Sequence, residues 1–168
     1  MCFKRILLLQ TVVLTIVLSS ICVAWAQDPR GDSKKSEVEL TVSAENVNFN
    51  AGSPLQVLIV LKNVSKSPVL LQVSCLELNY RFDVRRENGD PVPMTAEGER
   101  RSKVDPSACR RKTLLLQSGN SIRVGVDAAL LYDFTKVGRY RICVKREFRT
   151  ADGVWHKAES APLHVTIE

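Results

Sequence analysis

Most of the chain alternates between apolar and polar residues with a period of two. From residue 38 onward, Val38, Leu40 and Val42 alternate with charged or polar neighbours. Successive side chains of a β-strand point to opposite faces, so this pattern predicts a strand with one buried face. Comparable apolar patterns recur along the chain, and the strands they predict cover residues 38–42, 55–61, 68–76, 80–85, 112–117, 121–126, 138–145 and 163–167.

Short turn sequences separate these segments. Residues 50–54, 87–90 and 118–120 are rich in Asn, Gly, Ser and Pro, which favour turns. Asn88-Gly89 is a strong hairpin signal because both residues tolerate positive φ. A further hairpin is expected around Asp152-Gly153.

Helical patterns are short and weak. No stretch keeps a helical period for more than a turn or two, and the best candidate, 128–134, suffices for a single turn. Segment 95–108 is charged and follows neither period. We expect it to be the longest loop.

Together these patterns predict an all-β domain, an antiparallel β-sandwich of seven to nine strands. Six of the strands each place their apolar residues on one face, an arrangement that a helical fold cannot use. The residues expected inside are Val57, Ile59, Leu61, Phe82, Val84, Ile122, Val124, Tyr140, Ile142, Val165 and Ile167.

The first 26 residues differ from the rest. Lys4 and Arg5 precede an uncharged stretch rich in Leu, Val and Ile, and Ala24-Trp25-Ala26 stands before Gln27. A basic start, an apolar centre and a small-x-small cleavage site predict a secretory signal peptide over residues 1–26. The alternative is an uncleaved signal anchor, because 6–26 carries no charge and is roughly long enough to cross a bilayer. Either way we expect the rest of the chain outside the cytoplasm, secreted or in the periplasm or cell envelope.

The remaining chain has the size of one domain. Residues 27–36 are polar and predict a flexible leader, which leaves the sandwich residues 37–168. Two of the 24 basic residues lie in the signal, so residues 27–168 carry 22 basic against 18 acidic side chains, a net charge of +4. This charge is below that of a typical nucleic-acid-binding domain, so we expect no nucleic-acid partner.

A tyrosine motif resembles a known corner. Leu131 to Phe134 forms a short turn before Gly138-Arg139-Tyr140-Arg141-Ile142, which resembles the corner that leads into strand F of immunoglobulin-like sandwiches. The resemblance implies that the Tyr140 hydroxyl bonds a backbone group between Ala129 and Lys136. It also implies that Ile142 points inward, with Cys143 on the outward side. That cysteine position and the absence of a tryptophan on the presumed strand C separate the chain from antibody domains.

A second resemblance covers residues 43–92. The order of strands and turns there, from Pro54-Leu55 through Lys62-Asn63 to Asn88-Gly89, resembles small secreted or periplasmic immunoglobulin-like domains of bacteria that carry no assigned activity. It is similar, more weakly, to the intracellular proteinase inhibitor-like domain. Both resemblances imply an immunoglobulin-like sandwich and leave the function open, because this fold hosts many functions.

Catalytic and metal-binding patterns are weak in the sequence. Gly-x-Ser-x-Gly and Cys-x-x-Cys are absent, and the two histidines are His156 and His164. Because His164 alternates with Leu163 and Val165, it should point away from the core. We expect no enzyme, no cofactor and no metal site. Asn63-Val64-Ser65 fits a glycosylation acceptor, although a turn asparagine that caps the strand is the favoured interpretation.

Basic residues gather on two of the predicted strands. Arg81 and Arg85 on one strand, and Arg139, Arg141 and Lys145 on another, point away from the apolar face. These strands correspond to C and F of an immunoglobulin-like sandwich, which are neighbours in one sheet. The five residues would then form one cationic patch that could dock an anionic partner. The alternative is a charged solvent face that prevents sheets from associating.

Three cysteines remain after the signal. Cys75 ends a strand and Cys109 closes the long loop, whereas Cys143 lies in mid-strand. Loop ends adapt to disulfide geometry more easily, so we predict a Cys75–Cys109 bridge with Cys143 free or intermolecular.

Two functions remain open. The first is a non-enzymatic extracytoplasmic binding module whose partner is an unknown protein or an anionic envelope polymer, with membrane contact only if the signal is uncleaved. The second is a protease inhibitor that presents the 95–108 loop, where Arg100, Arg101 and Lys103 would be exposed.

Overall fold

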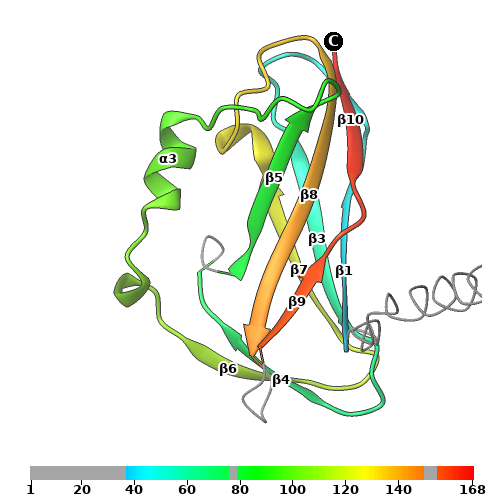
Figure 1. The fold of residues 1–168 in the computed structure, drawn as a ribbon, viewed down its shortest axis with the longest axis vertical. Helices are drawn as coiled ribbons and strands as arrows, with labels where there is room; N and C mark the ends of the chain where they lie inside the picture. The colour runs from blue at the N-terminus through cyan, green and yellow to red at the C-terminus, as the bar shows by residue number, and fades with distance from the viewer. Residues whose placement is uncertain (1–36, 76–78, 150–154) are drawn as a thin grey trace, which may run out of the picture. The chain divides into compact units, whose positions relative to one another are not determined.

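The computed structural model describes residues 37–75, 79–149 and 155–168 (Figure 1). The predicted signal segment 1–26, the leader 27–36 and the expected turn at Asp152-Gly153 lie outside the described residues. Their assignments therefore stay predictions. The described strands fall within one compact unit, Ser36–Glu168.

The first sheet has three strands in the order β1-β3-β7. These are β1 (Val38–Ala44), β3 (Gln56–Asn63) and β7 (Ser121–Asp127), and both pairings are antiparallel. Each strand follows the predicted alternation, as in β3, where Val57, Ile59 and Leu61 are buried and Leu58 is exposed.

The second sheet is built around the long strand β8 (Gly138–Arg149). β5 (Arg81–Arg86) pairs with one edge of β8, and β10 (Leu163–Ile167) and β9 (Trp155–Glu159) follow one another along the other edge. The short strand β2 (Asn48–Phe49) pairs with the outer edge of β10 and runs parallel to it. Figure 1 shows β5, β8 and β10 side by side.

A two-stranded ribbon completes the described strands. β4 (Val69–Val73) pairs antiparallel with β6 (Lys112–Leu116). The β4 sequence is apolar on both faces, but only its inward residues, such as Val69 and Leu71, are fully buried. Its outward face remains partly exposed because the ribbon forms a separate sheet.

The inward side chains of the sheets form one core, which confirms the all-β sandwich. Of the residues expected inside, eight are buried: Val57, Ile59, Leu61, Val84, Tyr140, Ile142, Val165 and Ile167. Phe82, Ile122 and Val124 are half-buried and pack against the same cluster.

The expectation of an irregular loop at 95–108 was wrong. Residues Ala96–Ser102 form helix α3, and Pro106–Ala108 form a 3₁₀ turn. A helix of two turns that buries only Gly98 leaves no apolar period to detect. Its acidic first turn and basic last turn, which suit the helix dipole, were the available sequence signal. The single turn expected after residue 128 is confirmed as the 3₁₀ helix Ala128–Leu130.

The described residues form ten strands, where seven to nine were expected. The additional strands are β9 and the two-residue β2, which is too short to show a period. The parallel β2–β10 pair also departs from a purely antiparallel sandwich. The turn at 118–120 is present, but the strands that it joins, β6 and β7, belong to different sheets.

The disulfide prediction is confirmed. Cys75 and Cys109 are bonded, with their Cα atoms 5.7 Å apart, inside the range of about 4.4–6.8 Å that a disulfide requires. The bridge ties the start of β6 to the end of the β4 region and so fixes one end of the segment that contains α3.

Candidate functional site

The outward faces of β5 and β8 bring the predicted basic residues together. In the antiparallel register Arg81 lies opposite Lys145, and Arg85 lies opposite Arg141. Arg139 stands one outward position further along β8. The expected adjacency of the two strands is therefore confirmed. We refer to Arg81, Arg85, Arg139, Arg141 and Lys145 as the cationic face.

A third strand extends this face. On β10, His164 lies opposite Arg141, which itself faces Arg85. The three side chains form one row across β5, β8 and β10. The sequence showed that His164 points outward, and its exposure confirms this. The row was not foreseen, because alternation within a strand does not reveal the register between strands.

Acidic neighbours balance part of the charge. Asp83 accepts a hydrogen bond from Arg85 Nε at 2.8 Å, Glu87 lies 3.3 Å from Arg139, and Glu159 lies 3.2 Å from Lys145. Exposed pairs of this kind contribute about 0–1 kcal/mol each. Within the described part of the chain, Arg81 and Arg141 take part in no ion pair.

A groove of about 540 Å³ opens at one end of the cationic face. Four arginines line it: Arg85, Arg86, Arg139 and Arg141. Among the described residues Glu87 is its one acidic lining residue, while the exposed Val47 contributes apolar surface and His164 lies on the β10 side. We call this cavity the Arg141 groove.

Arg86 supplies an orphan donor beside this groove. Its Nε is buried and has no hydrogen-bond partner within the described residues. Arg86 lies opposite Tyr140 in the β5–β8 register, at the end of the sandwich. An unsatisfied buried donor is unfavourable by about 1–3 kcal/mol. Because Arg86 shares the inward side of the sheet with Tyr140, this donor does not belong to the cationic face.

The free thiol of Cys143 lies on the same outward face, two residues along β8 from Arg141. It stands opposite Asp83, as expected for an outward residue, but it is only 6% exposed. Burial is the main cause that raises the pKa of the Cys143 thiol. Neighbouring long side chains such as Arg141 and Lys145 can cover an outward cysteine in this way.

Arg146 follows Lys145 but points into the core. It is 2% exposed, donates a hydrogen bond to the Tyr80 hydroxyl at 2.8 Å and stacks 5.0 Å from the centre of the Tyr80 ring. The arginine thus ties β8 to the start of β5 and does not contribute to the cationic face.

The Asn63 side chain is part of the fold. Asn63 is 0% exposed, and its amide donates to the carbonyl oxygens of Ser67 and Leu116, both at 2.8 Å. Its Oδ1 accepts from the backbone and hydroxyl of Ser65. These four hydrogen bonds confirm the interpretation of Asn63 as a capping asparagine.

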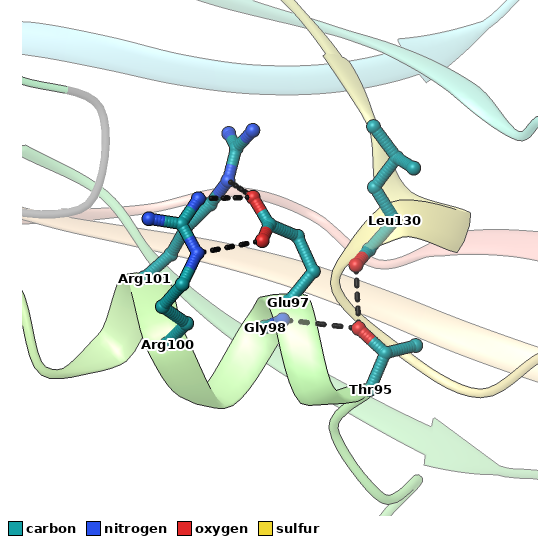
Figure 2. A network of polar contacts seen from close by, with 6 residues as sticks. All are labelled: Thr95, Glu97, Gly98, Arg100, Arg101 and Leu130. Atoms are coloured by element: carbon teal, nitrogen blue, oxygen red, sulfur yellow. Dashed lines mark hydrogen bonds and ion pairs between the residues drawn. The ribbon is translucent and has the colours of Figure 1, made fainter.

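The N-terminal end of α3 is held against the 128–132 turn (Figure 2). Thr95 caps the helix by accepting a hydrogen bond from the Gly98 backbone at 3.0 Å, and its hydroxyl donates to the Leu130 carbonyl oxygen at 2.5 Å. Its backbone N–H donates to Leu131 at 3.0 Å. With the disulfide at Cys109, both ends of this segment are anchored.

Two basic side chains of α3, Arg100 and Arg101, pair with the acidic Glu97 of the same helix. Glu97 accepts hydrogen bonds from Arg100 at 2.7 and 2.8 Å and from Arg101 at 2.6 Å, as Figure 2 shows. Hydrogen bonding to Arg100 and then to Arg101 lowers the pKa of Glu97 to about 2. Two of the three basic residues predicted for an inhibitory loop are therefore paired on a helix.

Other chemistry-bearing groups are dispersed. His156 stacks on Phe148, with ring centres 5.4 Å apart. In residues 37–75, 79–149 and 155–168 no three His, Cys, Asp or Glu side chains gather as a metal site would require. Within the same residues no helix is long and apolar enough to span a bilayer.

No family model and no curated protein matches this chain. Several solved structures resemble it at low identity. The sporulation control protein Spo0M from Bacillus subtilis has a TM-score of 0.40 and 11% identity, with 79% of this chain and 50% of that one covered. The ApaA protein from Bordetella pertussis has a TM-score of 0.46 and 10% identity, with 79% and 96% covered. BslA, a bacterial hydrophobin, has a TM-score of 0.39 and 10% identity, with 79% and 96% covered.

Proposed function

We propose that this protein is a non-enzymatic, extracytoplasmic binding module that docks an anionic envelope polymer on its cationic face. The observation that carries the proposal is the register of β5 and β8. It sets Arg85 against Arg141 and Arg81 against Lys145 on one outward face. Like charges directly opposite each other destabilise a sheet. Asp83 and Glu159 offset only Arg85 and Lys145, so an anionic partner that neutralised Arg81 and Arg141 would be bound favourably.

Two observations support the extracytoplasmic part of the proposal. The chain begins with the pattern of a secretory signal, and the Cys75–Cys109 disulfide suits an oxidising compartment. We further propose that the sandwich is immunoglobulin-like. The Tyr140 hydroxyl donates to the Lys136 carbonyl oxygen at 2.5 Å, inside the predicted stretch, which supports a tyrosine corner.

The proposal is tested by measuring binding of the chain without residues 1–26 to immobilised dextran sulfate, with neutral dextran as the reference. Binding should weaken as salt rises, because screening shortens the reach of exposed charges. The double variant Arg81→Gln/Lys145→Gln should bind about thirtyfold more weakly, from roughly 1 kcal/mol for each exposed charge lost.

A matched control removes the same charge from the opposite sheet. Lys62 and Arg123 are exposed residues on β3 and β7, and Lys62→Gln/Arg123→Gln should retain the original affinity. Equal losses in the two double variants would show that only net charge matters and would overturn the proposal. Tighter binding to duplex DNA than to dextran sulfate at the same salt would also contradict it.

A protease inhibitor remains the second candidate, because the segment from Thr95 to Cys109 is anchored at both ends. Pre-organisation of this kind lowers the entropic penalty of binding. The helical Arg100 and Arg101 are less suited to it, since both pair with Glu97. Limited digestion with trypsin separates the candidates. An inhibitor should stay intact and slow the protease, whereas a plain surface segment should be cut without inhibition.

A further inference from the structure

The Arg141 groove contains a more specific arrangement than the rest of the cationic face. Arg85, Arg141 and His164 stand in one row on three adjacent strands. Neighbouring strands lie about 4.8 Å apart, so the outer members of the row are separated by roughly 10 Å. Long side chains at this spacing can reach one small ligand above the central strand.

Arg141 is the available donor in this row. Arg85 already donates to Asp83 at 2.8 Å and to the Gly89 carbonyl oxygen at 3.2 Å. Arg141 is exposed and takes part in no ion pair within the described residues. Its guanidinium group therefore offers unused N–H donors to the groove. Arg139 is held by Glu87 alone in a 3.3 Å pair in which both side chains are about 70% exposed, and a ligand could displace that contact.

The lining indicates the charge of the ligand. With Glu87 in the lining and the Asp83 carboxylate bound to Arg85, the four lining arginines leave a net charge near +2, without counting His164. A dianion neutralises this charge better than a single carboxylate does. Guanidinium groups bind phosphate oxygens through paired hydrogen bonds.

The size and the apolar surface indicate what carries the phosphate. A volume of about 540 Å³ lies within the usual range of small-molecule sites, about 300–1,000 Å³, and exceeds what one phosphate group fills. Val47, which is 52% exposed, supplies apolar surface beside the arginines. Such surface suits the carbon skeleton of a sugar or polyol.

We propose that the Arg141 groove binds the phosphate monoester of a phosphorylated sugar or polyol, with Arg141 at the centre of recognition. The inference rests on the proposed function and deepens it. The groove would recognise a phosphorylated unit of the polymer, while Arg81 and Lys145 would contact the charges further along.

The test uses the chain without residues 1–26, with glucose 6-phosphate as the probe and glucose, inorganic phosphate and phosphatidate-containing vesicles as the other arms. Binding is followed by calorimetry and by amide shifts in two-dimensional NMR. We expect glucose 6-phosphate to bind more tightly than inorganic phosphate, glucose not to bind, and the shifts to lie around residues 85–89, 139–141 and 164–166. Equal binding of inorganic phosphate and glucose 6-phosphate would overturn the sugar assignment. Binding to the vesicles alone would overturn it as well and would show that the groove recognises the phosphate of a lipid headgroup.

Variants locate the site. Arg141→Gln should weaken glucose 6-phosphate binding about tenfold or more, as expected for the loss of a charge-assisted hydrogen bond. His164→Gln should weaken it less, and Arg81→Gln, outside the groove, should leave it within about twofold. All three residues are exposed, so folding should be retained, which circular dichroism checks. An equal effect of Arg81→Gln and Arg141→Gln would overturn the proposal.

A parallel titration with dextran sulfate separates this inference from the proposed function. Binding of dextran sulfate without binding of glucose 6-phosphate would refute the groove assignment and leave the docking face standing. If neither ligand binds, both proposals fail.

Discussion

Gly98 permits helix α3 to approach the 128–132 turn, and Gly98→Ala tests this contact. A Cβ at position 98 would lie 2.1 Å from the carbonyl oxygen of Leu131 and 2.9 Å from its carbonyl carbon. Ordinary contact between non-bonded carbon atoms is about 3.5–4.0 Å. Because both opposing atoms belong to the backbone, no change of side-chain rotamer can relieve the overlap. The helix or the turn has to move.

The size of the effect follows from the contacts that such a movement strains. Two hydrogen bonds from Thr95 to Leu130 and Leu131 contribute about 1 kcal/mol each, and overpacking adds about 1–3 kcal/mol. Alanine stabilises the helix by about 1 kcal/mol relative to glycine because its helix propensity is higher. The free energy of unfolding should therefore fall by about 2–4 kcal/mol, measured by urea denaturation with the disulfide intact.

Gly125→Ala is the matched control. Gly125 lies in β7, and a Cβ there would meet no heavy atom within 4 Å. This variant should be neutral or slightly more stable, by up to about 1 kcal/mol, because alanine reduces the entropy of the unfolded chain. If Gly98→Ala were as stable as the unmodified protein, helix propensity would outweigh the close approach and the reasoning would be refuted.

Four further outcomes are expected. Tyr140→Phe should lower the free energy of unfolding by about 1 kcal/mol in urea through loss of its hydroxyl bond, and no change would remove the corner argument. Ile142→Ala, at a fully buried position, should lower it by about 2–5 kcal/mol in the same assay. Replacing Cys75 and Cys109 together by serine should lower it by up to about 3–4 kcal/mol, because the bridge closes a loop with a sequence separation of 34; an unchanged denaturation midpoint would contradict this. The carboxyl of Glu97 should titrate by NMR near pH 2, and because its pKa is lowered in the folded state, its stabilising contribution is present above about pH 4.5 and lost as the pH falls through 2.

The sequence foretold features that depend on local pattern. Alternation identified the buried faces of β3, β8 and β10, because the side-chain period of a strand is a property of its own backbone. The Cys75–Cys109 bridge and the Tyr140 hydroxyl bond were also foreseen. Both predictions rest on local signals, a cysteine at a loop end and a tyrosine in a turn motif. Neither requires knowing which distant strands pair.

Features of the candidate site that depend on neighbouring strands were foreseen only in part. The pairing of the β5 and β8 faces followed from the resemblance to an immunoglobulin-like sandwich and not from their sequences. His164 was correctly placed outside the core, but nothing in its neighbourhood indicated that it would stand beside Arg141. Helix α3 was missed because it buries only Gly98 and so shows no apolar period; its acidic first turn and basic last turn were the signal that went unused.

The sequence by itself thus determined which residues of each strand point inward and which point outward. Only the tertiary structure decided which outward residues meet, since register depends on pairing and turn geometry along the whole sheet. The same distinction explains Asn63, whose amide is enclosed by a hydrogen bond to Leu116 of another segment. The direction in which a side chain points is a local property of its strand, whereas the residues beside it are set by the fold. The Arg141 groove depends on which residues lie side by side.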